Sequence, residues 1–245
     1  MPAIELVDVR KYYGKGETTV KAVDGVSVTV EKGEFISIVG RSGSGKTTLL
    51  DSIGLLMRPT TGTIRIDGED TTKMKDNQRA SYRAHKLGFI FQDFNLLDTL
   101  SAVENVLLPV RYSGADRKQA RERALQLLDD VGLADRANHR PTQMSGGEKQ
   151  RVSIARSLIN GPAIVLGDEP TGNLDTDTAQ NLVALMRRAN TDYNITFVVV
   201  THDMELASHT DRILRIKDGR LVSDERVTPS SPVTPAQLAE PVSAR

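Results

Sequence analysis

The first third of the chain alternates apolar and polar residues with the period of two that is typical of β-strands. Residues 26–30 alternate strictly, residues 4–9 alternate weakly, and residues 35–39 form a continuous apolar run of the kind found in buried strands. A helix is predicted to begin within residues 42–54 and to stop before Pro59. Further along, the same patterns predict three short elements: a strand at residues 62–68, a helix at 76–86 and a strand at 87–92.

The middle of the chain has the period of a helix. Helical patterns predominate in residues 101–160, and the clearest of them, at residues 120–131, ends at Gly132. We therefore expect an all-helical insertion, at about residues 95–160, between two strand-rich segments.

Strands and helices alternate again after this insertion. The predicted elements are strands at 162–169, 195–203 and 212–222, with helices at 177–190 and near Leu206. Such alternation is typical of a parallel sheet with crossover helices, so the fold class is α/β. Beyond residue 224, four prolines fall within a stretch rich in Ser, Thr and Ala. We predict one domain over residues 1–224 and a disordered tail over residues 225–245.

Composition limits the chemistry that the chain can perform. Its 245 residues suffice for a large core, and 32 basic residues balance 32 acidic ones, so charge gives no reason to expect nucleic acid as a partner. The absence of cysteine excludes disulfides, thiolate zinc sites and cysteine nucleophiles. No apolar run reaches the roughly 18 residues of a membrane span, and the N-terminus has no signal-peptide pattern. We expect a soluble, cytosolic protein.

The segment GRSGSGKT fits the phosphate-loop pattern G-x-x-x-x-G-K-[ST] without deviation. A predicted strand precedes it and a predicted helix follows, which argues against a merely flexible Gly/Ser turn. In such a loop backbone N–H groups surround phosphate oxygens, Lys46 supplies a positive charge and the Thr47 hydroxyl can ligate Mg²⁺. The predicted nucleotide-binding residues here are Gly40, Arg41, Ser42, Gly43, Ser44, Gly45, Lys46, Thr47 and Thr48.

Polar side chains at three other strand ends could complete a site for phosphoryl transfer. Asp168 could hold the water shell of Mg²⁺, and Glu169 could orient an attacking water. His202 follows another buried strand, where it could donate to a γ-phosphate. Gln92 could reach Mg²⁺ or the water. Taken singly, each is explained as well by an ordinary polar residue at a strand end, and only the phosphate loop favours reading them together.

The segment SGGEKQR begins a helix with two glycines, which would weaken a helix interior by roughly 1 kcal/mol each relative to alanine. A helix N-terminus attracts anions, because its free N–H groups and the macrodipole both favour negative charge. Ser145, Gly146 and Gly147 therefore predict a second phosphate contact, which a second subunit could supply. Tyr13 lies before a glycine-rich loop and could stack on a base, although the neighbouring Tyr12 could do so equally well.

The order of phosphate loop, Gln92, MSGGE, IVLGDE, GNLD and His202 resembles the ATP-binding subunit of ABC transporters, from about Ile4 to Val222. The resemblance implies a P-loop NTPase core with a parallel sheet, an N-terminal antiparallel β subdomain and an α-helical insertion. It implies an ATPase with ATP and Mg²⁺ as cofactors, Glu169, His202 and Gln92 as catalytic residues, and Thr47, Gln92 and Asp168 around the metal. It also favours Tyr13 over Tyr12 as the residue stacked on adenine.

The same resemblance implies particular partners. Residues 145–148 (Ser145, Gly146, Gly147 and Glu148), here called the signature segment, would close on ATP held by the phosphate loop of a second copy. The segments FNLLDTLSAVENVLLP and DEPTGNLD are similar to the subgroup that serves macrolide and peptide export, lipoprotein release and cell division. A separate membrane permease is then a partner, which would place the subunit on the inner face of the cell membrane. Met144 and Gly167 replace the more usual leucine and alanine, and the first change conserves volume.

Two other functions fit the sequence less well. A soluble ABC-type ATPase acting on DNA or ribosomes would carry two cassettes or a coiled-coil arm, whereas this chain has one phosphate loop and no heptad tract. A scaffold that binds ATP with little turnover would not need Glu169 and His202. The cargo and its direction, whether export, extrusion or mechanotransmission, are not readable from these residues.

Overall fold

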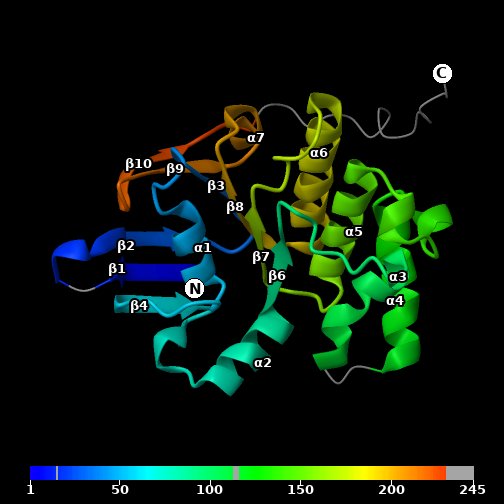
Figure 1. The fold of residues 1–245 in the computed structure, drawn as a ribbon, viewed down its shortest axis with the longest axis horizontal. Helices are drawn as coiled ribbons and strands as arrows, with labels where there is room; N and C mark the ends of the chain where they lie inside the picture. The colour runs from blue at the N-terminus through cyan, green and yellow to red at the C-terminus, as the bar shows by residue number, and fades with distance from the viewer. Residues whose placement is uncertain (15, 113–115, 230–245) are drawn as a thin grey trace.

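In residues 1–14, 16–112 and 116–229, which the computed structural model describes, the strands form two sheets (Figure 1). One sheet is antiparallel and has the order β2–β1–β4–β5. Its strands are β1 (Ile4–Tyr13), β2 (Val20–Val30), β4 (Thr61–Ile66) and β5 (Glu69–Asp70). The other has the order β10–β9–β3–β8–β7–β6, parallel except for β10. Its strands are β3 (Phe35–Val39), β6 (Leu87–Ile90), β7 (Ile164–Asp168), β8 (Thr196–Thr201), β9 (Arg212–Lys217) and β10 (Arg220–Arg226).

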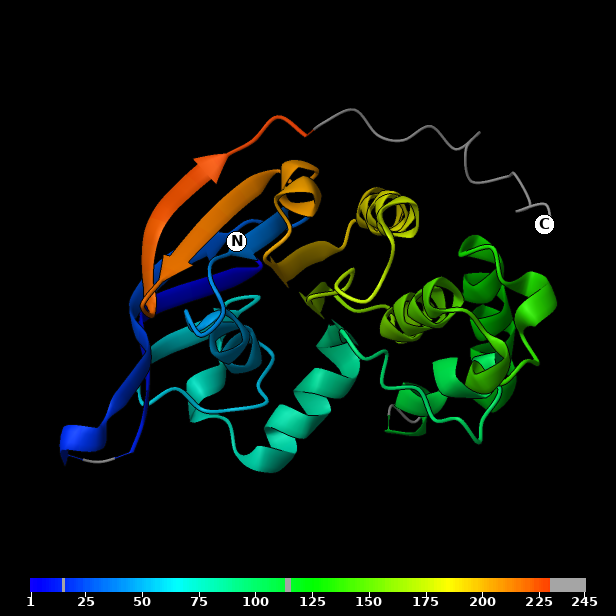
Figure 2. The same ribbon diagram turned by 45° about the horizontal axis from the view of Figure 1, so that its top comes forward.

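The helices fall into two groups. Those outside the predicted insertion are α1 (Lys46–Ile53), α2 (Asp76–Lys86), α6 (Thr176–Tyr193) and α7 (Met204–Ser208). The others lie within the predicted insertion: α3 (Ala102–Val106), α4 (Arg117–Asp130) and α5 (Gly146–Leu158). Figure 2 shows α3 and α4 standing away from both sheets, while α5 contacts β6, α6 and these two helices. None of the helices formed by the described residues is long and apolar enough to cross a bilayer.

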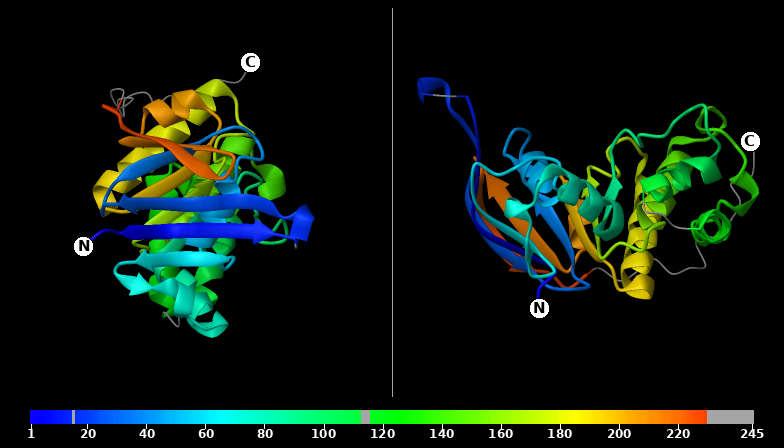
Figure 3. Two further views of the ribbon diagram at one scale, coloured as in Figure 1. Left: turned by 90° about the vertical axis from the view of Figure 1, so that its left-hand side faces the viewer. Right: turned by 90° about the horizontal axis from the view of Figure 1, so that it is seen from below.

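The buried strands of the six-stranded sheet direct successive side chains to opposite faces, and this separates two cores. Ile36, Ile38 and Val200 pack with α1 and with the antiparallel sheet. Phe35 and Phe197, with ring centroids 5.3 Å apart, pack with α5 and α6. The right panel of Figure 3 shows these layers side by side, with the N-terminal antiparallel sheet at one end and the helices of the insertion at the other. As a consequence, α1 and α5 lie on opposite faces of the same sheet.

The structure confirms the α/β fold with its N-terminal antiparallel sheet and helical insertion, and it differs from the sequence prediction in detail. Strand β2 begins at Val20, well before the strictly alternating residues 26–30. Register shifts in its pairing with β1 interrupt the period of two, so the alternation revealed only the last part of the strand. The predicted domain boundary at residue 224 falls inside β10. Glu225 and Arg226 continue the ladder with β9, so the domain extends past that boundary. Residues 230–245 of the predicted tail lie outside the described residues.

Candidate functional site

The phosphate loop joins β3 to the N-terminus of α1. Lys46 Nζ donates to the carbonyl oxygens of Gly40 at 2.8 Å and Arg41 at 3.1 Å, so the ammonium group lies over its own loop. Residues 41–43 form the exposed tip. No side chain caps the first turn of α1, which leaves its N–H groups for a ligand. The loop therefore presents a positive charge and free backbone donors together.

Two of the loop glycines are required by close packing. A Cβ atom on Gly45, whose φ is +100°, would lie 1.9 Å from the carbonyl oxygen of Ala22. One on Gly40 would lie 2.2 Å from the carbonyl oxygen of Ile216. Backbone from β2 and from β9 thus presses against the loop, and only glycine fits at these points. Their role includes holding the loop in place as well as letting phosphate approach.

One buried polar atom in this loop has no partner. Ser44 is only 6% exposed, and its Oγ makes no hydrogen bond in the structure. A buried hydroxyl without a partner is destabilising, whereas a phosphate oxygen would satisfy it. Together with Lys46 and the uncapped end of α1, this hydroxyl is consistent with a nucleoside triphosphate bound at the loop.

A metal position is suggested where the phosphate loop meets the end of β7. Thr47 Oγ1 donates to Asp168 Oδ1 at 3.2 Å. Burial raises the pKa of Asp168, and the charge of Glu169 raises it further, against the Thr47 hydrogen bond and the charge of Lys46. A nearby cation would favour the ionised carboxylate. Among the described residues, no cluster of three or more His, Asp or Glu could bind a metal by itself. Mg²⁺ would therefore rely on a few protein oxygens and the substrate phosphates, as is usual for it.

Glu169 and His202 are brought together from the ends of β7 and β8. His202 Nδ1 lies 2.9 Å from Glu169 Oε2, and the His202 backbone N–H donates to the same oxygen at 3.3 Å. Glu169 has φ of +45° and donates its N–H to the carbonyl of Val200. Its side chain is 17% exposed, whereas that of His202 is 70% exposed. A non-glycine residue in this conformation, held by its neighbours, is typical of a functional position.

Gln92 follows β6 and lies against the segment after Glu169. A Cβ atom on Gly172 would be 3.0 Å from Gln92 Nε2. Asn173 Nδ2 donates to the Gln92 carbonyl at 3.1 Å and to Asp93 Oδ1 at 3.2 Å. Gln92 is thus tied to the Glu169 side of the site. The predicted pairing of Gln92 with Thr47 at a metal remains a prediction.

The signature segment is satisfied within its own chain. Ser145 Oγ accepts from the Glu148 N–H at 3.2 Å, and Glu148 Oε2 accepts from the Ser145 N–H at 2.8 Å. This reciprocal capping box starts α5, and the pattern S-x-x-E could have predicted it. Arg136 also forms an ion pair with Glu148 at 3.5 Å. A Cβ atom on Gly147 would lie 2.5 Å from Thr178 Cγ2, so this glycine permits close packing of α5 on α6.

The two neighbouring tyrosines differ in their surroundings. The Tyr12 hydroxyl donates to Asp24, and that hydrogen bond is the main cause that raises the pKa of Tyr12. Tyr13 is 42% exposed, its hydroxyl contacts Met57 Sδ at 3.3 Å, and Lys11 Nζ lies 5.2 Å from its ring centre. The Tyr13 ring is therefore accessible to a base, while Tyr12 is engaged with the sheet.

Sequence reasoning gave no individual role to three residues that surround this site. Gln150, Arg156 and Asn173 all donate from their side chains to backbone carbonyls near Gln92. The one available signal was Gln150, a polar residue on the stripe of α5 that also carries Ile154 and Leu158. Such a position favours a buried structural role, but it does not reveal the partner.

Comparisons with known proteins point to one family. The family model described as ABC transporter matches residues 23–172. An ABC transporter ATP-binding protein of Thermotoga maritima is 50% identical over 91% of this chain and 95% of its own length. The lipoprotein-releasing system ATP-binding protein LolD of Geobacter metallireducens is 46% identical over 90% of this chain and 98% of its own. A solved dimer of an ATP-binding cassette, in a post-hydrolysis state bound to ADP and Pi, matches with a TM-score of 0.84. It is 41% identical and is covered completely, by 93% of this chain.

Some relatives are much longer. The macrolide export ATP-binding/permease protein MacB of Hyphomonas neptunium is 45% identical over 91% of this chain, which spans 34% of that protein.

Proposed function

Because the chain belongs to the ABC transporter family, we propose that it binds and hydrolyses ATP as the motor subunit of a transporter whose permease is a separate polypeptide. Two copies would form the working unit, with one ATP between the phosphate loop of each copy and the signature segment of the other. The dimeric cassette bound to ADP and Pi supports both the assembly and the reaction.

The observation that carries the proposal is the placement of α1 and α5 on opposite faces of the six-stranded sheet. The phosphate loop begins one of these helices and the signature segment begins the other. Both have the features of a phosphate contact, yet the sheet separates them within one chain (Figures 1 and 2). A second copy, facing head to tail, would supply the missing half of each site.

The residues divide the chemistry among them. Lys46, Ser44 and the loop N–H groups would hold the β- and γ-phosphates, while Thr47, Asp168 and Gln92 would hold Mg²⁺. The metal would neutralise charge on the phosphates. Glu169 would orient the attacking water and accept its proton, in a position that its hydrogen bonds with His202 maintain. The partner's signature segment would contact the γ-phosphate.

Two inactive variants test the shared site by complementation. Lys46→Ala removes the phosphate-loop charge, and Ser145→Arg blocks the signature segment. Each variant alone should hydrolyse ATP at a small fraction of the wild-type rate. Mixed, they form some dimers in which one site combines an intact phosphate loop with an intact signature segment, so activity should reappear. No recovery would contradict a site shared between two chains, and an active Ser145→Arg protein on its own would show that the signature segment takes no part in hydrolysis.

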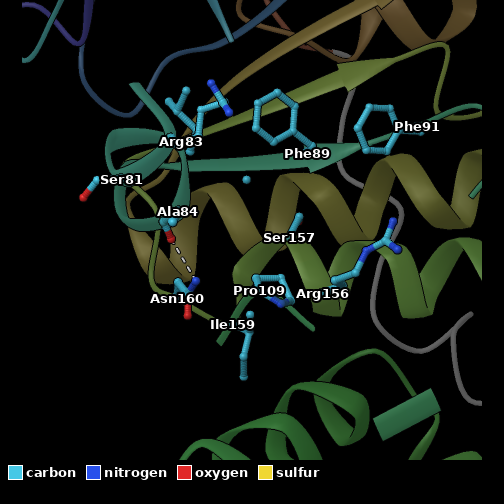
Figure 4. A pocket seen from close by; sticks show the side chains of 13 residues that line it. Ser81, Arg83, Ala84, Phe89, Phe91, Pro109, Arg156, Ser157, Ile159 and Asn160 are labelled. Carbon is cyan, nitrogen blue, oxygen red and sulfur yellow. Dashed lines mark hydrogen bonds between the residues drawn. The ribbon is translucent and has the colours of Figure 1, made fainter. Parts of the chain in front are cut away.

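A hollow beside Gln92 supplies a place for the permease. It has a volume of about 640 Å³ and lies between α2, β6 and the end of α5 (Figure 4). The stacked rings of Phe89 and Phe91, 5.9 Å apart, form part of its wall, and Arg83 and Arg156 border it. We propose that a short cytoplasmic segment of the permease, apolar with an acidic group, binds here, directly next to the segment that carries Gln92.

The names of the relatives indicate the class of cargo. MacB joins an ATP-binding part to a permease in one macrolide export protein, and LolD belongs to a lipoprotein-releasing system. Large amphipathic molecules handled at a membrane are therefore the proposed cargo of this transporter.

An Ala84→Arg variant, which fills the hollow, should keep the ATPase rate of the isolated subunit and lose co-purification with a co-expressed permease. Unchanged co-purification would place the permease elsewhere.

A further inference from the structure

The segment of residues 91–95, here called the Gln92 loop, has a strained backbone. Phe94 and Asn95 both have left-handed φ, at 61° and 50°. Asparagine tolerates this region well, but a bulky residue such as phenylalanine adopts it only when its surroundings enforce it. Two such residues in succession, separated from Gln92 only by Asp93, require contacts that hold them.

Side chains from two other segments hold the carbonyl groups of this loop. Arg156, on α5, donates to the carbonyl of Asn95 and, at 2.7 Å, to that of Phe94. Asn173, after Glu169, donates to the carbonyl of Gln92. Gln150, also on α5, is 0% exposed and donates to the carbonyl of Phe91 at 3.3 Å. Four carbonyl groups of the loop are therefore fixed by three side chains.

Helix α5 is the main anchor among these contacts. Its residue Gln150 also donates to the carbonyl of Pro170 at 2.6 Å, next to Glu169. The Phe94 ring lies near the N-terminus of the same helix, where a Cβ atom on Gly146 would be 3.9 Å from Phe94 Cζ. One helix therefore carries the signature segment at its start and holds the Gln92 loop along its length.

We propose that Arg156 is a positioning residue for Gln92. Its planar guanidinium binds two successive carbonyls at once, which keeps Phe94 and Asn95 left-handed and places the Gln92 amide beside the Glu169 segment. This inference rests on the proposed function, in which Gln92 reaches Mg²⁺. It adds a link between the two copies. Helix α5 carries the signature segment, which would contact the partner's ATP, and the same helix carries Arg156, which would position Gln92 of its own chain. Burial lowers the pKa of Arg156 to about 10, so the group stays charged at neutral pH.

The test measures metal affinity directly, without relying on turnover. In the full chain carrying Glu169→Gln, Mn²⁺ binding in the presence of ATP is followed by electron paramagnetic resonance. Arg156→Met should raise the Kd of Mn²⁺ by about tenfold, the lower range for residues that orient a metal ligand, and leave the metal-free Kd of ATP nearly unchanged. Arg156→Lys should fall between, because an ammonium does not reproduce the planar two-pronged contact.

Matched variants separate positioning from general damage. Arg123, on α4, also donates to two carbonyls, those of Leu158 and Ile159 at the C-terminal end of the same helix, so Arg123→Met should not change the Kd of Mn²⁺. Thermal unfolding confirms that each variant is folded.

The outcomes distinguish the two proposals. If Gln92→Ala leaves the Kd of Mn²⁺ unchanged, the assignment of Gln92 to the metal is wrong. If Gln92→Ala weakens binding while Arg156→Met does not, only the positioning role of Arg156 is wrong. Equal weakening by Arg123→Met and Arg156→Met would likewise contradict it.

Discussion

The phosphate loop and the signature segment are both helix N-termini suited to phosphate, yet their own chain treats them differently. In the phosphate loop, Ser44 Oγ has no hydrogen-bond partner among the described residues, and Lys46 Nζ donates to carbonyl oxygens of the loop itself. The N-terminus of α1 has no side-chain cap. In the signature segment, Ser145 and Glu148 cap each other. The loop is therefore incomplete without a ligand, whereas the signature segment is locally complete before any partner arrives. Unsatisfied polar groups support the first half of the proposed site, whereas only the sequence pattern and the fold support the second.

The largest effect is expected at Glu169, which belongs to the loop side of the site. Glu169→Gln should reduce the ATPase rate by about a thousandfold, within the range for loss of a general base, and leave ATP affinity nearly unchanged. His202→Ala should cost less, because His202 maintains the carboxylate through a single oxygen. Steady-state hydrolysis and binding of a fluorescent ATP analogue measure the two quantities. A larger loss for His202→Ala would reverse the assigned roles.

Glycine substitutions compare the packing of the two regions. Gly45→Ala should lower the free energy of unfolding by about 3 kcal/mol, because its Cβ meets backbone at Ala22 and its φ is positive. Gly147→Ala should lower it by only about 1 kcal/mol, since its Cβ meets a side-chain methyl group of Thr178, which yields more easily than backbone, and its φ is not positive. Denaturant unfolding without nucleotide provides both values. Equal losses would contradict the picture of a loop fixed between rigid strands.

The two tyrosines test where the base lies on the loop side. Tyr13→Ala should weaken ATP binding by about 1 kcal/mol, the scale of one aromatic contact. Tyr12→Ala should leave ATP binding nearly unchanged and instead reduce stability, because it removes the hydrogen bond to Asp24. Binding titrations and thermal unfolding on both variants separate the effects. Weaker ATP binding in Tyr12→Ala alone would move the base to the other tyrosine.

The smallest effect is expected from the charge of Asp51, on α1 after the phosphate loop. Burial, and then the charge of Asp168, raises the pKa of Asp51. A raised pKa means that the folded state favours the protonated acid, so stability is lost as pH rises through the folded pKa. Asp51→Asn should therefore raise the Tm of the nucleotide-free protein at neutral pH, and the gain should shrink as pH falls.

The signature segment provides the control for that charge. Glu148→Gln keeps a residue that can complete the capping box, so it should change the Tm little at any pH. Thermal unfolding from about pH 4, near the ordinary pKa of an Asp side chain, up to about pH 8 compares the two variants. A gain for Asp51→Asn that did not depend on pH would show that its charge is not the cause.

The sequence predicted the parts of the site that follow from local pattern. The phosphate loop is defined by its spacing, and Asp168, Glu169 and His202 by their places at the ends of buried strands. The contacts of Gln150, Arg156 and Asn173 could not be predicted, because each joins a side chain to a backbone carbonyl 59 to 81 residues away. Strand β2 was predicted too short because bulges interrupt its alternation. Every residue has a backbone carbonyl, so the identity of a residue does not reveal that a distant side chain donates to it.

The shared site is the central claim, and sizing chromatography with ATP tests it most directly. Glu169→Gln should accumulate an ATP-bound dimer, because hydrolysis no longer releases it. Adding Ser145→Arg should return the protein to monomers that each retain ATP, since the new side chain would block the partner's γ-phosphate. Thermal unfolding checks that loss of the Ser145 cap leaves the protein folded. A folded double variant that dimerises as readily as Glu169→Gln alone would contradict the claim that two chains build each site.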